Sequence, residues 1–297
     1  MTAYIYLNKK GAVKMKIGII GAGKVGVSIG KYLKENGAEA RVEVTGFFSR
    51  SSKSTVEAAE FTGTEKFENI AKLVETNEII FITVPDDNIQ EVYHDIRKYN
   101  ITGKILCHFS GVLSSEIFDD ISKYGAYAVS IHPVYAFADK YSSYINLGSA
   151  HLVMEGMKEA LVPLEKLFKS LNHTIHVIDT CDKSKYHAAA AMCSNHVVAL
   201  IHASVSLFCE CGFEKEQAMK MIEPLVKGNI ENIFNKGCKA ALTGPVERND
   251  IKTVKKHLEA LNDNKIKQAY IETAKIIVDL AEQKNPDRNY RKMSDLF

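Results

Sequence analysis

A short apolar segment that runs directly into a glycine-rich loop constrains this chain more than any other feature. Residues 15–20 read Met-Lys-Ile-Gly-Ile-Ile, as expected of a buried parallel strand, and a glycine follows them. The next six residues have the pattern G-x-G-x-x-G, and they open a helix with Val25, Ile29 and Leu33 on one face. Strand, glycine loop and helix in this order predict a unit that binds a dinucleotide.

Each glycine of this loop has its own expected role. Gly21 allows the tight turn, Gly23 lets the backbone approach a pyrophosphate, and Gly26 lets the helix lie close to the strand. The helix N-terminus adds N–H groups and the positive end of its dipole. A glycine-rich turn without a ligand is the alternative, but the flanking strand and helix favour a phosphate site. We therefore expect the pyrophosphate to contact Gly21, Ala22, Gly23, Lys24, Val25 and Gly26.

The end of the second apolar segment, residues 42–48, indicates which dinucleotide is bound. An NAD site usually has a carboxylate here that accepts a hydrogen bond from the ribose 2′-OH. This chain has Ser49, Arg50 and Ser51 instead. A guanidinium flanked by hydroxyl groups suits the 2′-phosphate of NADP, so these residues predict NADP(H) as the cofactor. The alternative is that Arg50 is a solvated loop cation.

Apolar and helical segments alternate as far as residue 180. We expect strands at 78–84, 104–109, 126–131, 151–154 and 174–178, and helices at 53–60 and 89–98. This alternation predicts a mainly parallel, doubly wound α/β sheet of the Rossmann type. Ligands of such sheets bind beyond the carboxyl ends of the strands, so we expect cofactor contacts from Val84, Pro85, Ser110 and Gly111. Asp86 and Asp87 are expected to cap the next helix.

The second half of the chain is helical. Beyond residue 182 there is no convincing strand pattern, and helices are expected at 183–211, 214–235, 247–261 and 264–284. A length of 297 residues suits two domains. We predict a Rossmann domain at 15–180 and an all-α domain at 181–297. Residues 1–14 are expected to be an extension, with Met15 as an alternative start.

Composition narrows the classes of function. The 38 Lys and Arg residues nearly balance the 36 Asp and Glu residues, which argues against a partner as highly charged as nucleic acid or an anionic membrane. The six cysteines show no disulfide framework, and Cys209-Glu210-Cys211 lacks a second ligand pair, so no metal site is expected. We expect a cytoplasmic protein.

One segment is long and apolar enough to test against a membrane. Residues 186–209 contain no Asp, Glu, Lys or Arg. Their histidines, serines and asparagine would be costly in lipid. A buried central helix, either of one helical domain or at a homodimer interface, is the favoured interpretation.

Several polar residues are candidates for the chemistry. His108 and His132 follow or end expected strands on the cofactor side, where each is either a packed residue or part of the site. Lys183 and His187 share a helix face with Ser194, and Asn195 lies next to it. A cation, an imidazole and an amide on one stripe can bind an anion and protonate a product. The alternatives are a solvated Lys183 and a Ser194 that only permits close helix packing.

The chain resembles bacterial proteins that join a Rossmann-like domain to a helical domain of unknown function, DUF2520. They are relatives of pyrroline-5-carboxylate reductase, ketopantoate reductase and the 6-phosphogluconate dehydrogenase-like group. The matching residues are 19–26, 83–86, 108–111 and 132–133, then Lys183, 186–190, 194–195, 241–246, Arg248 and Asp250. The resemblance implies an NADP-type Rossmann domain, a helical domain that dimerises, and a substrate cleft between the two. A lysine and an asparagine of the first long helix serve the substrate in related reductases, which implies such roles for Lys183 and Asn195.

The sequence thus predicts an NADP(H)-dependent oxidoreductase that reduces a small, possibly anionic, carbonyl or imine compound. Lys183 or His187 is the expected proton donor, Asn195 orients the substrate, and His108 and His132 line the site. An NADP-binding sensor without turnover is one alternative. A deazaflavin-dependent NADP oxidoreductase is another. The pair His132-Pro133 is also similar to the His-Pro motif of prephenate dehydrogenases, although Val134 and the residues after it differ.

Overall fold

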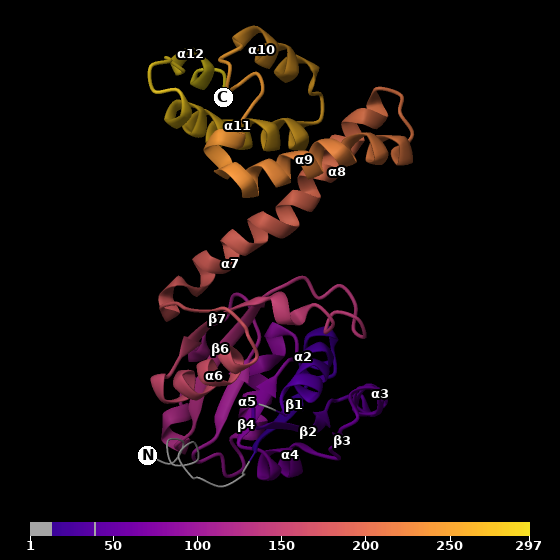
Figure 1. Ribbon diagram of the computed structural model, residues 1–297, viewed down its shortest axis with the longest axis vertical. Helices are drawn as coiled ribbons and strands as arrows, with labels where there is room; N and C mark the ends of the chain where they lie inside the picture. The colour runs from indigo at the N-terminus through magenta and orange to yellow at the C-terminus, as the bar shows by residue number, and fades with distance from the viewer. Residues whose placement is uncertain (1–13, 39) are drawn as a thin grey trace. The chain divides into compact units, whose positions relative to one another are not determined.

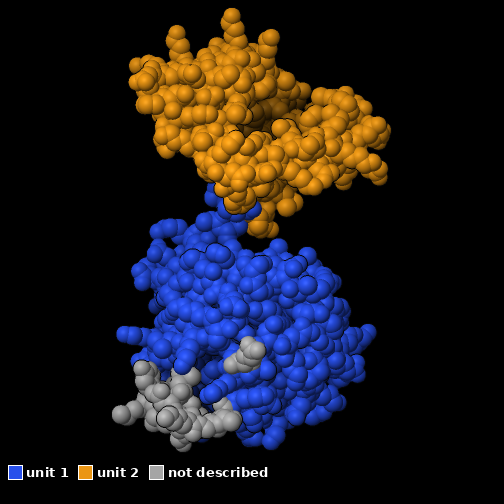
Figure 2. Space-filling model, in the orientation of Figure 1, with its two compact units in different colours: residues 1–193 blue, residues 194–297 orange. Residues whose placement is uncertain are grey.

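The computed structural model describes residues 14–38 and 40–297, so the predicted extension lies almost entirely outside the described residues. The chain divides into two compact units, Met1–Cys193 and Ser194–Phe297, which Figure 2 shows in blue and orange. The sequence analysis placed the domain boundary at 180/181. Helix α7 (Lys183–Ala191), which carries two of the candidate site residues, is part of unit 1.

Unit 1 is built on one eight-stranded sheet in the order β3-β2-β1-β4-β5-β6-β7-β8. All neighbours are parallel except the antiparallel pair β6–β7, so the predicted mainly parallel Rossmann-type sheet is confirmed. The short β3 and the reversal of β7 were not predicted. The strands are β1 (Met15–Ile20), β2 (Val42–Phe48), β3 (Glu65–Lys66), β4 (Ile79–Ile82), β5 (Ile105–His108), β6 (Tyr127–Val134), β7 (His151–Gly156) and β8 (Ile175–Val177).

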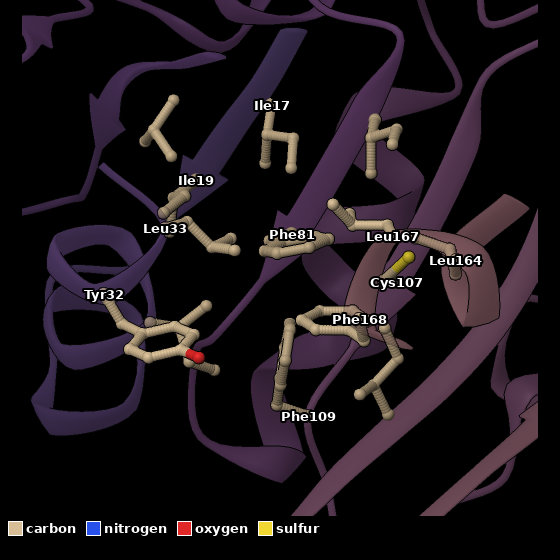
Figure 3. Close-up of a cluster of buried hydrophobic side chains, with 14 of the residues drawn as sticks. Ile17, Ile19, Tyr32, Leu33, Phe81, Cys107, Phe109, Leu164, Leu167 and Phe168 are labelled. Atoms are coloured by element: carbon tan, nitrogen blue, oxygen red, sulfur yellow. The ribbon is translucent and has the colours of Figure 1, made fainter. Parts of the chain in front are cut away.

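Helices cover both faces of this sheet (Figure 1). They are α2 (Lys24–Asn36), α3 (Ser52–Thr62), α4 (Ile70–Thr76), α5 (Ile89–Ile96) and α6 (Lys158–Ser170). Successive strand residues point to opposite faces, so Ile19 packs in one apolar cluster and Ile20 in the other. Figure 3 shows the first cluster, in which Leu33 of α2, Phe81 of β4 and Leu164 of α6 take part. Both faces are therefore sealed, and the strand ends remain for ligands.

The strand order reverses beside β1, because the chain proceeds to β2 and β3 on one side and returns to β4 on the other. Ligands of open α/β sheets bind at such a switch point, outside the carboxyl ends of the strands. Gly21 follows β1 there, and Thr83 follows β4. Ser110 lies just beyond β5, and His132 lies near the end of β6. The topology thus places the glycine loop and the candidate chemical residues on one edge of one sheet.

Unit 2 is helical, and no strand is assigned to any described residue beyond 182, as predicted. A π-helical turn, Met192–His196, connects α7 to α8. The predicted continuous helix at 183–211 is therefore interrupted. Helix α9 contains a break at Gly237, and Asp250 caps α10 by accepting a hydrogen bond from the Thr253 N–H. The helices are α8 (Val197–Glu210), α9 (Lys215–Ala241), α10 (Ile251–Ala260), α11 (Asn264–Lys284) and α12 (Arg291–Ser294).

The uncharged segment at 186–209 forms most of α7 and α8. By length and composition alone, the helical run Thr180–Glu210 is the one run among the described residues that could cross a membrane. Few of its side chains are covered by the rest of the chain; within α8 only Val205 is buried. Within its own unit α8 is therefore not a buried helix, and a partner copy remains the interpretation to test.

Candidate functional site

The glycine loop has the geometry of a phosphate cradle. Gly21 has φ +109°, which favours glycine, and a Cβ there would lie 2.7 Å from the Thr83 carbonyl oxygen. A Cβ on Gly26 would collide with the Thr83 hydroxyl and the Gly21 carbonyl oxygen. Apart from its chain neighbours, no described residue has an atom within 4 Å of the position that a Cβ on Gly23 would take. Two glycines therefore permit close packing, and the third leaves space at the start of α2 for a phosphate.

A cavity of about 390 Å³ opens beside this loop. Arg50 and Ser49 line it after β2, with Val84 and Pro85 after β4. The Arg50 Nη2 donates a hydrogen bond of 3.2 Å to the Asn88 Oδ1. Apolar side chains beside the glycine loop suit the adenosine of a nucleotide, so the residues fit a nicotinamide dinucleotide. The lining residues are Ile20, Gly21, Ala22, Gly23, Phe48, Ser49, Arg50, Ser54, Ile70, Thr83, Val84, Pro85, Asn88, Glu91, Val92 and Asp95.

The remaining predicted cofactor residues have other positions. Lys24, Val25 and Gly26 start α2 without lining this cavity. The Ser51 hydroxyl caps α3 by accepting a hydrogen bond of 3.2 Å from the Ser54 N–H, and Ser54 lines the cavity instead. Ser54 and Asn88 were missed because only the folded α3 and the turn before α5 bring them to Arg50.

The loop after β5 is held together by its own side chains. The Ser110 hydroxyl donates to the Asp86 carboxylate at 2.8 Å and accepts from the N–H groups of Val112 and Leu113. The prediction that Asp86 and Asp87 cap the next helix is wrong: neither the turn at Asp86–Asn88 nor α5 has a side-chain cap. Asp86 instead fastens the Ser110 loop to the end of β4.

His108 serves the same loop. Its side chain is fully buried; the Nδ1 accepts a hydrogen bond of 3.3 Å from the Ser110 N–H, and the Nε2 lies 3.1 Å from the Ser114 carbonyl oxygen. The Nε2 must therefore carry the proton, and burial lowers the pKa of this imidazole to about 4. The expectation that His108 lines the site does not hold, because it shapes the loop from behind.

Lys183 is buried, with 1% of its surface exposed. Its Nζ donates a hydrogen bond of 2.6 Å to the Ser130 hydroxyl on β6. Burial lowers the pKa of Lys183 to about 8, while the carboxylates of Glu155 and Asp86 act in the opposite direction. The alternative of a solvated lysine at the start of the helix is therefore wrong.

His132, Tyr186 and His187 form a group at the end of β6 and the first turns of α7. The His132 Nδ1 lies 2.7 Å from the Tyr186 hydroxyl oxygen, and the His132 and His187 rings meet edge to face at 5.7 Å. Burial, and then the charge of Lys183, lowers the pKa of His132 to about 4, and burial raises that of Tyr186 to about 12. Near neutral pH both groups are therefore uncharged and share one hydrogen bond, whose direction depends on which ring nitrogen of His132 carries the proton.

Gly111 lies against these two histidines. A Cβ at this position would collide with the His187 Nδ1 and lie 3.0 Å from the His132 Nε2. The His187 Nδ1 is buried and has no hydrogen-bond partner among the described residues. An unpaired buried nitrogen is costly, so this atom is a candidate for a further hydrogen bond.

Asn195 lies outside unit 1, the unit that holds His132, Tyr186 and His187. It is exposed in the π-helical turn, belongs to unit 2, and its Oδ1 accepts a hydrogen bond of 3.0 Å from Ser194. The predicted stripe assumed an uninterrupted α-helix, and the π turn changes the angle between successive residues before it reaches Ser194. Its role in substrate orientation stays a prediction.

Sequence reasoning also missed two buried residues behind the group, Ser130 and Glu155. Both lie within strands and are almost inaccessible to solvent. A signal existed for Glu155, because a carboxylate inside the apolar run of β7 is rarely buried without partners. Ser130 gave none, since a serine inside a strand is ordinary.

Comparisons with known proteins agree with this architecture. Residues 8–133 match the model of the Rossmann-like domain, and residues 150–277 match that of DUF2520, a domain of unknown function. The fold and the glycine cradle thus define a Rossmann-type protein with a helical C-terminal region. More particularly, the chain joins a Rossmann-like domain to a DUF2520 domain, as its resemblance implied. Among curated proteins, none matches it.

Solved structures show the same fold over nearly the whole chain. Protein TM1727 from Thermotoga maritima is 26% identical, with a TM-score of 0.69, and the match covers 90% of this chain and 99% of that one. A putative NADP oxidoreductase, BF3122 from Bacteroides fragilis, is 18% identical (TM-score 0.69; 91% and 100% covered). An imine reductase from Myxococcus stipitatus, a V8 variant in complex with NAD⁺, is 15% identical (TM-score 0.64; 90% and 94% covered).

Proposed function

We propose that this protein is an NADP(H)-dependent oxidoreductase that reduces a small carbonyl or imine compound. The observation that carries the proposal is the common edge of the sheet, where the dinucleotide cradle and the group of His132, Tyr186 and His187 both lie. The names of the similar structures support it, since they include a putative NADP oxidoreductase and an imine reductase.

Bound NADPH supplies the hydride. The substrate carbon accepts that hydride while its oxygen or nitrogen gains a proton, so the products are an alcohol or amine and the oxidised dinucleotide. The structure favours His187 over Lys183 as the proton donor. Lys183 is buried and already donates to Ser130, whereas the Nδ1 of His187 is unpaired and lies beside Gly111. In this proposal the hydrogen bond with Tyr186 holds His132 in place, and the His132 ring packs edge to face against His187.

The cofactor preference rests on the surroundings of Arg50. Its partner is the neutral amide oxygen of Asn88, so its charge is not neutralised by a hydrogen-bonded carboxylate. The N-terminus of α3, with Ser51 as its cap, follows directly. A guanidinium and a helix N-terminus favour a 2′-phosphate, which NADP has and NAD lacks.

Calorimetric titration with NADPH and then NADH tests the cofactor. Keto acids and cyclic imines are then screened by the loss of NADPH absorbance. We expect NADPH to bind more tightly than NADH and at least one substrate class to be turned over. Binding of neither dinucleotide would remove the proposal. Tight NADPH binding without turnover across the screen would favour the NADP-binding sensor.

We also propose a homodimer formed through the helical unit. Apolar side chains of α8 and α9 are exposed, including Val198 at 70% and Phe234 at 85%. Such a surface usually marks an interaction site. Sedimentation is expected to show a dimer. The variant Phe234→Asp is expected to raise the dissociation constant of this dimer by about 30-fold or more, as loss of a central aromatic residue does. Val162→Asp, on α6 of unit 1, is the control. A wild-type monomer at all concentrations would refute the dimer.

A further inference from the structure

Glu155 is a buried acid in the middle of β7. Its side chain is 1% exposed, and three donors bind its carboxylate. The N–H and the hydroxyl of Ser115 donate at 2.7 and 2.8 Å, and the Thr180 hydroxyl donates at 3.0 Å. Ser115 ends the loop that begins at Ser110, and Thr180 starts the turn that leads into α7. One carboxylate of β7 therefore ties two segments to the sheet, the Ser110 loop and the turn before α7, and both segments lead to residues of the candidate site.

The neighbour of Glu155 across the sheet is Ser130. The antiparallel register of β6 and β7 pairs these two residues directly, and directly opposite side chains project from the same face. The Ser130 hydroxyl accepts the hydrogen bond from the Lys183 ammonium. A buried cation and a buried anion thus flank one serine.

Few charged or titratable groups surround the Lys183 ammonium. Glu155 on β7 and, more weakly, Asp86 after β4 favour its charged form, while burial opposes it. His108 on β5 and His132 on β6 are neutral imidazoles whose pKa values the lysine lowers. The Tyr186 ring of α7 has its centroid 5.9 Å from the Nζ. Glu155 is therefore the main group that can keep this buried amine protonated near neutral pH.

We infer that Glu155 is a positioning residue, which holds Lys183 in its charged form beside Ser130 and ties the start of α7 and the Ser110 loop to the sheet. This inference rests on the proposed function, because the charge of Lys183 then acts on the catalytic group. Burial, reinforced by the charge of Lys183, lowers the pKa of His132 to about 4 and keeps this imidazole neutral beside the Tyr186 hydroxyl, with its Nε2 close to Gly111.

The charge of Lys183 can be measured without any substrate. In protein labelled with ¹³C at the lysine Cε, pH titration is expected to show a resonance with a midpoint of about 8, absent from Lys183→Met. In Glu155→Gln this midpoint is expected to fall by about one pH unit or more, the usual effect of losing an adjacent opposite charge. An unchanged midpoint would overturn the inference.

Glu78→Gln is the matched control. Glu78 is a partly buried acid directly before β4, and its charge acts on Lys104 rather than on Lys183. This variant is expected to lower the midpoint of Lys104 and leave that of Lys183 in place. With a substrate in hand, Glu155→Gln should also move the alkaline limb of the kcat profile to lower pH. Absence of turnover would count against the proposed function alone, because the titration does not depend on it.

Glu155→Gln removes the anion that faces the buried ammonium, so the double variant Glu155→Gln/Lys183→Met is the second arm in case the single variant does not fold. Removing both charges of a buried pair is usually far less destabilising than removing one. If the single variant is unfolded, the double variant is expected to recover a cooperative thermal transition. Failure of the double variant as well would show that Glu155 serves packing only, and the inference would be wrong.

Discussion

Replacement of Arg50 with alanine is expected to weaken NADPH binding by about ten- to a hundredfold and to leave NADH binding almost unchanged. The guanidinium lines the cavity beside β2 and is the one cationic group among the described residues that line it. A charge-assisted hydrogen bond that is lost costs an affinity of this order. Because NADH lacks the phosphate, calorimetric titration of both dinucleotides separates loss of this contact from general damage to the site.

Two further variants sharpen this test. Lys53→Ala removes the same charge from an exposed position on α3 that does not line the cavity, so it should change neither affinity. Asn88→Asp places a carboxylate where Arg50 now donates to an amide oxygen, and it should reduce NADPH binding although Arg50 is intact. Equal losses for NADH and NADPH in Arg50→Ala would contradict an NADP-specific site.

Replacement of His187 with alanine is expected to lower kcat by about 10²- to 10⁴-fold with little change in NADPH affinity. This is the range that general acid catalysis contributes. His187 has an unpaired, buried Nδ1 beside Gly111, while the dinucleotide cavity does not include it. Steady-state rates with the substrate found in the screen, together with an NADPH titration, measure both quantities.

The control for His187 is His151→Ala. His151 is an exposed histidine at the start of β7, two residues along the β6–β7 ladder from the partner of His132, and its ring stacks on His176 rather than on the catalytic group. Its removal should leave kcat unchanged. A His187→Ala variant with normal turnover would exclude this residue as proton donor. A protein that binds NADPH and responds to a partner without any turnover would instead be the sensor.

The fold was largely predictable because apolar periodicity and glycine positions are local signals. β1 and β2 were predicted with the bounds they have, and the other long strands to within a few residues. The glycine loop carried enough information to locate the cofactor edge. The antiparallel β7 was not predictable, since strand direction depends on how the chain returns to the sheet rather than on composition.

The candidate site was harder to predict, because its chemistry depends on burial and pairing. Lys183 and His187 were found from helix spacing, but the sequence did not reveal that Lys183 would be buried against Ser130. His108 looked equivalent to His132, and only the folded loop shows that its two ring nitrogens are already occupied. The contact between Glu155 and Thr180 joins residues of β7 and the turn before α7, a tertiary pairing without a local pattern.

The pairing of β7 with β6 has a consequence for chimaeras that are assembled from two such proteins. The two matched family regions invite a crossover between residues 133 and 150, but that junction separates two neighbouring strands of one sheet. The β6–β7 ladder runs from Val129 opposite Gly156 to Val134 opposite His151, and both sides of it would then come from different parents. A chimaera joined there would inherit Ser130 from one parent and Glu155 from the other. A chimaera should therefore take β6, β7 and α7 from the same parent protein.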